Sequence, residues 1–169
     1  MGYGFFRLRR AVGCFRQNYE SKHPYASFKD LAHIQALISK SARILQAQYY
    51  KKSEIEAALE LVRGIEELII AGSFLVAEHE RKIIGCGGWA FDVSYPRKAE
   101  IRGFFVHPDF VRRGVAALLL NTCENICLRR GIETLYLTAT LSGEPFYKKH
   151  GFLNLRDSIG ICQMDRLLN

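Results

Sequence analysis

The apolar residues of this chain follow a helical spacing in its first third and an alternating one near its middle. Between Phe28 and Leu45, "FKDLAHIQALISKSARIL", they recur at intervals of three and four residues, which predicts an amphipathic helix. Ser53 and Glu56 form the Ser-x-x-Glu pattern of a capping box, so a second helix is expected from there to about Leu68. Gly64 is the position at which that helix would kink or end.

The alternating pattern that follows predicts a sheet. Ser73–Glu78 and Ile83–Asp92 flank the polar tetrad His79–Lys82, as the two strands of a hairpin do. A third strand is expected at Ala99–Val106, where β-branched and aromatic residues gather.

Helical spacing returns at Gly114–Arg130, and the Arg-Arg-Gly sequence that ends it suits the C-terminus of a helix. Three shorter elements complete the pattern: a strand at "TLYLTA", a short helix at "GEPFYKKHG" and a last strand at "GICQMDRLL".

The order of these elements predicts a single α/β (α+β) domain. Its mixed, mostly antiparallel sheet would be flanked by helices, in the order strand, two helices, three strands, helix, strand, helix, two strands. The first strand would come from residues 5–11, where "FRLRRA" alternates apolar and basic residues. Residues 1–27 would form a basic N-terminal strand or arm, and residues 28–169 the domain itself.

The composition fits a soluble globular protein, since 49% of the 169 residues are apolar and 24% are charged. No apolar run is long enough to span a membrane and no secretory signal is evident, so a cytoplasmic location without a membrane partner is expected. The five cysteines are odd in number and include no Cys-x-x-Cys pair, which predicts reduced thiols and no metal site.

The net charge of +7 comes from the N-terminal part of the chain. Residues 1–52 hold ten Lys or Arg against two Asp or Glu, a balance of +8, and residues 53–169 hold fourteen against fifteen, a balance of −1. A solvated basic face explains this best, and a nucleic-acid-associated protein is the alternative. The sequence leaves open whether the chain is a monomer or a homodimer.

The stretch "FFVHPDFVRRGVAALLL", Phe104 to Leu120, joins the end of a strand to the start of a helix. The free N–H groups and the dipole of a helix N-terminus attract phosphate-like anions. Gly114 would let the backbone approach such an anion closely, and Arg112 and Arg113 would add positive charge. The stretch therefore indicates an anion site, with a purely architectural strand–turn–helix as the alternative.

The segment "AEIRGFFVHPDFVRRGVAALLLNTCE" resembles the acetyl-CoA-binding motif of the GNAT superfamily of N-acetyltransferases, a strand followed by Gln/Arg-x-x-Gly-x-Gly/Ala at the head of a helix. "LYLTATLSGEPFYKKHGF" is similar to the family's next motif, and "KDLAHIQALISKSAR" and "FLVAEHERKIIGCGGW" are similar to its first helix and central hairpin. The resemblance covers about Lys29 to the C-terminus. The family's first strand lies shortly before the first helix: "KHPYAS" has that spacing but contains a proline, and "FRLRRA" has the pattern but lies further upstream.

The resemblance implies that the anion is the diphosphate of acetyl-CoA, the co-substrate of an acyltransferase. Backbone amides from about Val111 onwards would bind it, although Val111 itself stands where the family has Gln or Arg. The strand backbone would pair with the pantetheine arm, and one of its N–H groups would polarise the thioester carbonyl. Ser142 would lie near the cofactor, where many relatives have Asn. The cofactor-binding residues expected on this basis are Phe104, Phe105, Val106, Val111, Arg112, Arg113, Gly114, Val115, Ala116, Ala117 and Ser142.

The resemblance also implies a direct attack of an amine on the thioester, without a covalent enzyme intermediate. Tyr147 occupies the place of the family's general acid, and its alternative interpretation is a core aromatic beside Phe146. Glu100 aligns with a strand glutamate that serves some family members as a base, and an ion pair with a neighbouring basic residue explains it equally well. His107 is expected to be a turn residue.

The acceptor is expected to be a primary amine of a small molecule or of a protein. In this fold it would enter opposite the cofactor, over the first two helices and the central hairpin, where Tyr49, Tyr50, Glu54 and Glu56 could line its path. The predicted function is therefore N-acetyl transfer from acetyl-CoA. An acyl-CoA-binding sensor without turnover is a further alternative.

Overall fold

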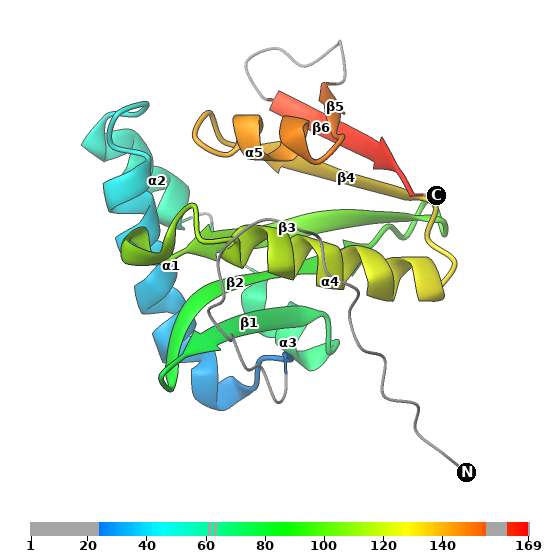
Figure 1. Cartoon of the computed structure of the whole chain (residues 1–169), viewed down its shortest axis with the longest axis horizontal. Coiled ribbons are helices and arrows are strands. Elements are labelled where there is room, and N and C mark those ends of the chain that lie inside the picture. The colour runs from blue at the N-terminus through cyan, green and yellow to red at the C-terminus, as the bar shows by residue number, and fades with distance from the viewer. Residues whose placement is uncertain (1–23, 61, 63, 155–161, 169) are drawn as a thin grey trace.

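The computed structural model describes residues 24–60, 62, 64–154 and 162–168 (Figure 1). The strand predicted at residues 5–11 lies outside this part of the chain. The described chain begins with a 3-10 turn, Phe28–Asp30, which is closed by a capping box: the Ser27 N–H donates to Oδ2 of Asp30 at 2.7 Å. The first helix, α1 (Leu31–Leu45), follows directly and buries one apolar face.

The segment predicted as a helix from Ser53 to about Leu68, with a kink or an end at Gly64, forms two helices. These are α2 (Lys52–Glu60) and α3 (Ile65–Ile70). Gly64 precedes α3 with a φ of +85°, a left-handed conformation that cannot continue a right-handed helix. Among the described residues, no helix combines the length and apolar character that a bilayer crossing requires.

The sheet has six strands in the spatial order β1-β2-β3-β4-β6-β5. Their bounds are β1 Phe74–His79, β2 Lys82–Phe91, β3 Lys98–Val106, β4 Thr134–Ala139, β5 Leu153–Asn154 and β6 Cys162–Leu167. The pair β3–β4 is parallel and is joined by α4 (Val115–Arg129), whereas the other described pairs are antiparallel. The predicted mixed, mostly antiparallel sheet is confirmed.

Helices cover both faces of the sheet. Figure 1 shows α4 in front of the strands and α1 and α3 behind them. The core is accordingly divided: one cluster packs α4 against the sheet, and a second packs α1 and α3 against the other face. A short helix, α5 (Glu144–Lys149), follows β4 and packs its Tyr147 into the α4 cluster.

The outer edge of β1 is covered by the segment just before the first turn. The Ala26 N–H donates to the Phe74 carbonyl at 2.9 Å, and the Val76 N–H donates to the Pro24 carbonyl at 2.7 Å. Pro24 takes part only as an acceptor, so its missing N–H costs this pairing nothing. Of the two candidates for a first strand, the described part of "KHPYAS" therefore lies along the sheet edge.

Candidate functional site

The parallel strands β3 and β4 pair only at their N-terminal ends. Lys98–Glu100 are in register with Thr134–Tyr136, and in the described chain the ladder between these two strands goes no further. Beyond this point β3 stays paired with β2, and β4 with β6. Two strand edges therefore face each other without pairing toward their C-terminal ends, which is the end where parallel strands bind ligands.

A β-bulge in β3 shapes this edge. Arg102 pairs with Gly88 and Phe105 with Cys86, so that Gly103 and Phe104 together oppose one residue of β2. Gly103 has a φ of +66°, which glycine adopts without strain. After the bulge, Phe104 packs into the α4 cluster and Phe105 into the α1/α3 cluster. The predicted strand residues Phe104–Val106 thus lie at the separation, and their pairing with a ligand stays a prediction.

The loop between β3 and α4 ends in two left-handed residues, Arg112 with a φ of +60° and Gly114 with a φ of +86°. Gly114 is the N-cap of α4, whose first backbone bond runs from the Leu118 N–H to the Gly114 carbonyl at 2.9 Å. The N–H groups of Val115–Ala117 therefore have no carbonyl partner within the helix. A Cβ placed at Gly114 would meet nothing within 4 Å, so this helix start is open.

The amide of Val111 differs from those that follow it. It lies 3.5 Å from the Pro108 carbonyl, inside the short 3-10 turn Pro108–Phe110. Val111 is therefore not among the free amides, although the sequence predicted that the free amides begin there.

The first turn of α4 is held close to the sheet by a glycine. A Cβ built at Gly85 of β2 would lie 2.5 Å from Cγ1 of Val115 and 3.2 Å from Cδ1 of Leu119. Only a residue without a side chain lets the helix start approach β2 this closely. The sequence carried a signal for it, because glycines inside the "GCGGW" strand indicate a close approach.

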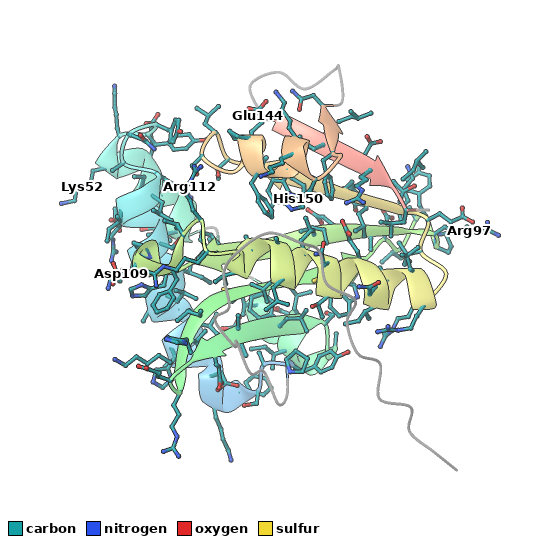
Figure 2. All side chains as sticks on the ribbon, viewed as in Figure 1. Lys52, Arg97, Asp109, Arg112, Glu144 and His150 are labelled. Carbon is teal, nitrogen blue, oxygen red and sulfur yellow. The ribbon has the colours of Figure 1, made fainter. Side chains whose placement is uncertain are left out.

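Basic side chains and aromatic rings surround the same loop. The guanidinium of Arg113 lies over the Phe110 ring, 5.2 Å from its centre, and the His107 ring packs against the same phenylalanine. Lys40 of α1 places its Nζ 3.0 Å from Nε2 of His107, which links α1 to the loop. His107 thus has the structural role expected of a turn residue. Arg112 is exposed and lies at the α4 start (Figure 2).

Tyr147 is buried on α5, with only 8% of its surface exposed. Its ring packs edge-on against those of Phe146 and Phe152, with centroids 5.1 and 5.6 Å away. Burial, and secondarily the nearby Cys123 thiol of α4, raise the pKa of Tyr147 above its usual range. Tyr147 therefore packs in the core and its hydroxyl keeps its proton at neutral pH, and its role as a general acid stays a prediction.

Glu100 lies on the α1/α3 face of β3, beside Arg102. Nε of Arg102 donates to Oε2 of Glu100 at 2.7 Å, and Nη2 lies 2.5 Å from the same oxygen, so the ion-pair interpretation is confirmed. In the next strand, the Tyr136 hydroxyl donates to Oδ2 of Asp92 at 2.9 Å. Burial, and then this hydrogen bond, raise the pKa of Tyr136 to about 12.

The two carboxylates predicted for the acceptor side serve the helices instead. Glu56 of α2 pairs with Arg43 of α1 at 2.7 Å, and Glu54 accepts from the Lys51 N–H at 2.7 Å. Tyr50, in contrast, reaches across the molecule: its hydroxyl oxygen accepts from the Leu141 N–H at 2.9 Å.

That bond ends in the loop between β4 and α5. In the same loop, Oγ of Ser142 lies 3.0 Å from Oγ1 of Thr140. Ser142 thus lies beside the C-terminal end of β4, and its contact with a cofactor stays a prediction.

Two hollows lie near β3. One, of about 530 Å³, opens on the α3 side of the sheet and is lined by Gly64, Glu67, Leu68, Ala71, Ser73, Ala90, Phe91 and Arg102. Sequence reasoning missed its Glu67, which no pattern distinguishes from other helix-surface glutamates.

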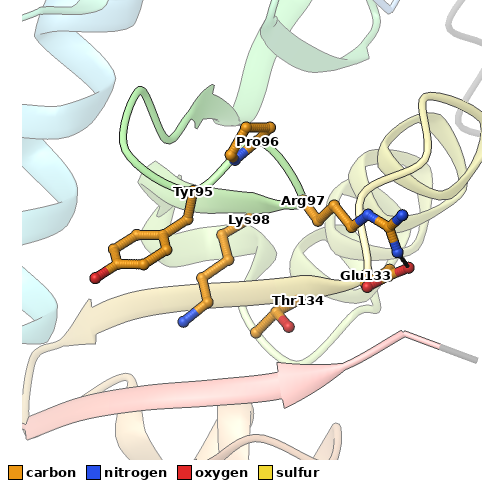
Figure 3. Close-up of a pocket in the computed structure, with 6 residues that line it drawn as sticks. All are labelled: Tyr95, Pro96, Arg97, Lys98, Glu133 and Thr134. Atoms are coloured by element: carbon orange, nitrogen blue, oxygen red, sulfur yellow. Dashed lines mark hydrogen bonds and ion pairs between the residues drawn. The ribbon is translucent and has the colours of Figure 1, made fainter.

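The other hollow, of about 350 Å³, lies where β3 and β4 begin and is bordered by the Arg97–Glu133 ion pair (Figure 3). Figure 2 shows Arg97 and Arg112 at opposite ends of the molecule. This second hollow is therefore remote from the α4 start.

Comparison with known proteins identifies the family. Residues 39–152 match the acetyltransferase (GNAT) family. The uncharacterized N-acetyltransferase YjcF of Bacillus subtilis is 25% identical over 122 residues, covering 70% of this chain and 85% of YjcF. An uncharacterized N-acetyltransferase of Chlorobaculum tepidum is 32% identical over 93 residues, which are 54% of this chain and 57% of that protein.

Solved structures show the same fold. The crystal structure of PaiA N-acetyltransferase from Thermoplasma acidophilum, in complex with coenzyme A, superposes with a TM-score of 0.73 at 21% identity, covering 84% of this chain and 95% of that one. The matched family region contains the separation of β3 and β4, the open start of α4 and Tyr147 of α5. The chain therefore belongs to the GNAT family of acetyltransferases.

Proposed function

We propose that this protein transfers the acetyl group of acetyl-CoA to a primary amine, which attacks the thioester directly. The observation that carries the proposal is the open start of α4 beside two unpaired strand edges. Two relatives named N-acetyltransferases and the coenzyme A complex of the similar PaiA structure support it.

The residues around the α4 start fit a diphosphate. The N–H groups of Val115–Ala117 would bind it at the positive end of the helix dipole, with the Arg112 and Arg113 side chains as counter-charges. The free edge of Phe104–Val106 would orient the pantetheine arm through backbone hydrogen bonds, as a neighbouring strand would. When bound, acetyl-CoA supplies an activated acyl thioester.

Two side chains would carry out the proton transfers, one to the departing thiolate and one from the attacking amine. The buried Tyr147 hydroxyl, still protonated at neutral pH, would donate to the departing thiolate. Both contacts from Arg102 are with Oε2 of Glu100, so Oε1 would accept a proton from the amine, directly or through a water molecule. Holding amine and thioester together would supply much of the rate enhancement.

The test combines binding with turnover. Calorimetry should detect binding of coenzyme A by the purified protein, and a panel of primary amines with acetyl-CoA should release free thiol for at least one amine. Binding without release for every amine would make the protein an acyl-CoA sensor, and absence of binding would overturn the proposal. The cytoplasm is the expected location, where the buried thiols of Cys86, Cys123 and Cys127 would stay reduced.

A further inference from the structure

The Tyr50 side chain connects two segments that lie 91 positions apart in the sequence. Its hydroxyl oxygen accepts from the Leu141 N–H at 2.9 Å, which joins the turn after α1 to the loop before α5. The turn is well anchored: the Tyr50 N–H donates to the Gln46 carbonyl at 3.0 Å, and the Arg43–Glu56 ion pair ties α1 to α2. The bridge therefore starts from a backbone that α1 and α2 hold in place.

This bridge closes a ring around the separation of β3 and β4. The base of the ring is the short ladder between Lys98–Glu100 and Thr134–Tyr136. One side is β3 with α1 packed against it, and the other side is β4, which leads to Leu141. Figure 1 shows α2 and the loop before α5 facing each other across the widened gap between the two strands. The Tyr50–Leu141 hydrogen bond joins these two far ends.

We infer that Tyr50 is a specificity-determining residue that restricts the acceptor to an amine on a narrow, unbranched chain. The inference rests on the proposed function and on the expected entry of the amine over the first two helices, on the α1/α3 face, which would bring it through the ring. A slender aliphatic amine or a flexible chain end fits such a passage. A lysine on the flat surface of a folded protein, or an amine on a branched carbon, has to break the bridge first.

The expected size of the effect follows from the bridge itself. One hydrogen bond of this kind contributes about two- to tenfold in an equilibrium. Tyr50→Phe removes the bond and keeps the ring of the side chain, whereas Tyr50→Ala also opens the passage. Tyr95→Phe is the control, because Tyr95 is exposed at the remote hollow and the described residues offer its hydroxyl no hydrogen bond.

Binding of two conjugates tests the inference without turnover. In each, the sulfur of coenzyme A is linked through an acetyl spacer to the nitrogen of butylamine, either the linear or the tertiary isomer. Calorimetry with the native protein should show tighter binding of the linear conjugate. Tyr50→Phe should reduce this preference by about two- to tenfold and Tyr50→Ala by at least as much, whereas Tyr95→Phe should leave it unchanged.

Amide hydrogen exchange gives a second readout. Exchange of the Leu141 amide should be faster in Tyr50→Phe and stay as in the native protein in Tyr95→Phe. If Tyr50→Ala does not fold, the inference is tested with Tyr50→Phe alone, by conjugate binding and by exchange of the Leu141 amide.

Equal affinity of the native protein for both conjugates, or a preference that persists in the Tyr50 variants, overturns the inference and leaves the proposed function intact. Failure to bind coenzyme A or either conjugate overturns both. If the preference depends on Tyr50 but acetyl-CoA releases no thiol, the inference about Tyr50 is supported and only the proposed acetyl transfer is contradicted.

Discussion

Arg102 contacts one carboxylate oxygen of Glu100 and not the other: its Nε donates to Oε2 at 2.7 Å and its Nη2 lies 2.5 Å from the same atom, while the described residues give Oε1 no hydrogen bond. The two side chains are 49% and 23% exposed, so the ion pair itself contributes only about 0–1 kcal/mol to stability. Variants at these positions can therefore separate a catalytic role from a structural one, because neither should unfold the domain.

Glu100→Gln should lower kcat/KM for the amine by about 10²-fold or more if Glu100 accepts the proton. Its free energy of unfolding should change by no more than about 1 kcal/mol. Arg102→Gln is the control, since it breaks the same pair and keeps the carboxylate. Equal, small losses of activity in both variants would mean that Glu100 is only an ion-pair partner and not the general base.

Tyr147→Phe should lower kcat by about 10²- to 10⁴-fold, because it removes the hydroxyl that protonates the thiolate. The dissociation constant for coenzyme A should hardly change, since the phenylalanine ring still fills the same core position against Phe152. Steady-state kinetics and calorimetry check the two halves of this prediction. Tyr95→Phe, at the remote hollow, should affect neither quantity, and a Tyr147→Phe enzyme with undiminished kcat would exclude the general acid.

The raised pKa of Tyr147 predicts a pH dependence with a definite sign. The folded state holds this proton more tightly than the unfolded state, where the pKa is about 10. Between the two values the folded protein binds more protons, so stability falls as pH rises above about 10. Denaturant unfolding at about pH 9 and about pH 11 should show a larger loss for the native protein than for Tyr147→Phe. An identical loss in both would place the hydroxyl in contact with water.

Gly85→Ala should destabilise the fold by about 1–3 kcal/mol, because the new Cβ overlaps Val115 at the start of α4. Coenzyme A binding should weaken as well, since the helix start that offers its amides is displaced. Thermal unfolding and calorimetry measure both effects.

A double variant, Gly85→Ala with Val115→Ala, provides the control. Val115→Ala removes the methyl group that the new Cβ would meet, so the two losses of stability should sum to more than the double variant shows. Strict additivity would mean that the close approach does not set the position of α4.

The sequence predicted the strand–loop–helix segment because its signals are local. Apolar spacing, the arginines and Gly114 all lie within a few residues of one another, and they indicate an open helix start without knowledge of the rest of the chain. The division of the second helix was only partly visible. Gly64 marked the break, but a glycine is compatible with a kink as well as an end, and its left-handed φ of +85° decides between them.

Contacts between distant segments explain what remained hidden. The hydrogen bond of Tyr50 depends on Leu141, 91 positions away, and no sequence pattern around either residue predicts their contact. Glu54 and Glu56 looked equally suited to an acceptor path, yet Glu56 pairs with Arg43 of α1 and Glu54 accepts from the Lys51 N–H at the start of α2. The side of β3 that each phenylalanine faces was also hidden, because simple alternation does not reveal a bulge.

The bulge at Gly103 shifts by one residue the alternation of β3 side chains between the two faces of the sheet. Ile101 packs with the α4 cluster before it, and Phe104, rather than Phe105, does so after it. If the same residues alternated regularly without the bulge, Phe104 and Phe105 would exchange surroundings and every later group of the strand edge would turn by half a period. A change that abolishes the bulge but keeps the number of residues would therefore redirect the edge at the open strand separation, whereas removing the extra residue as well would leave each phenylalanine on its present face.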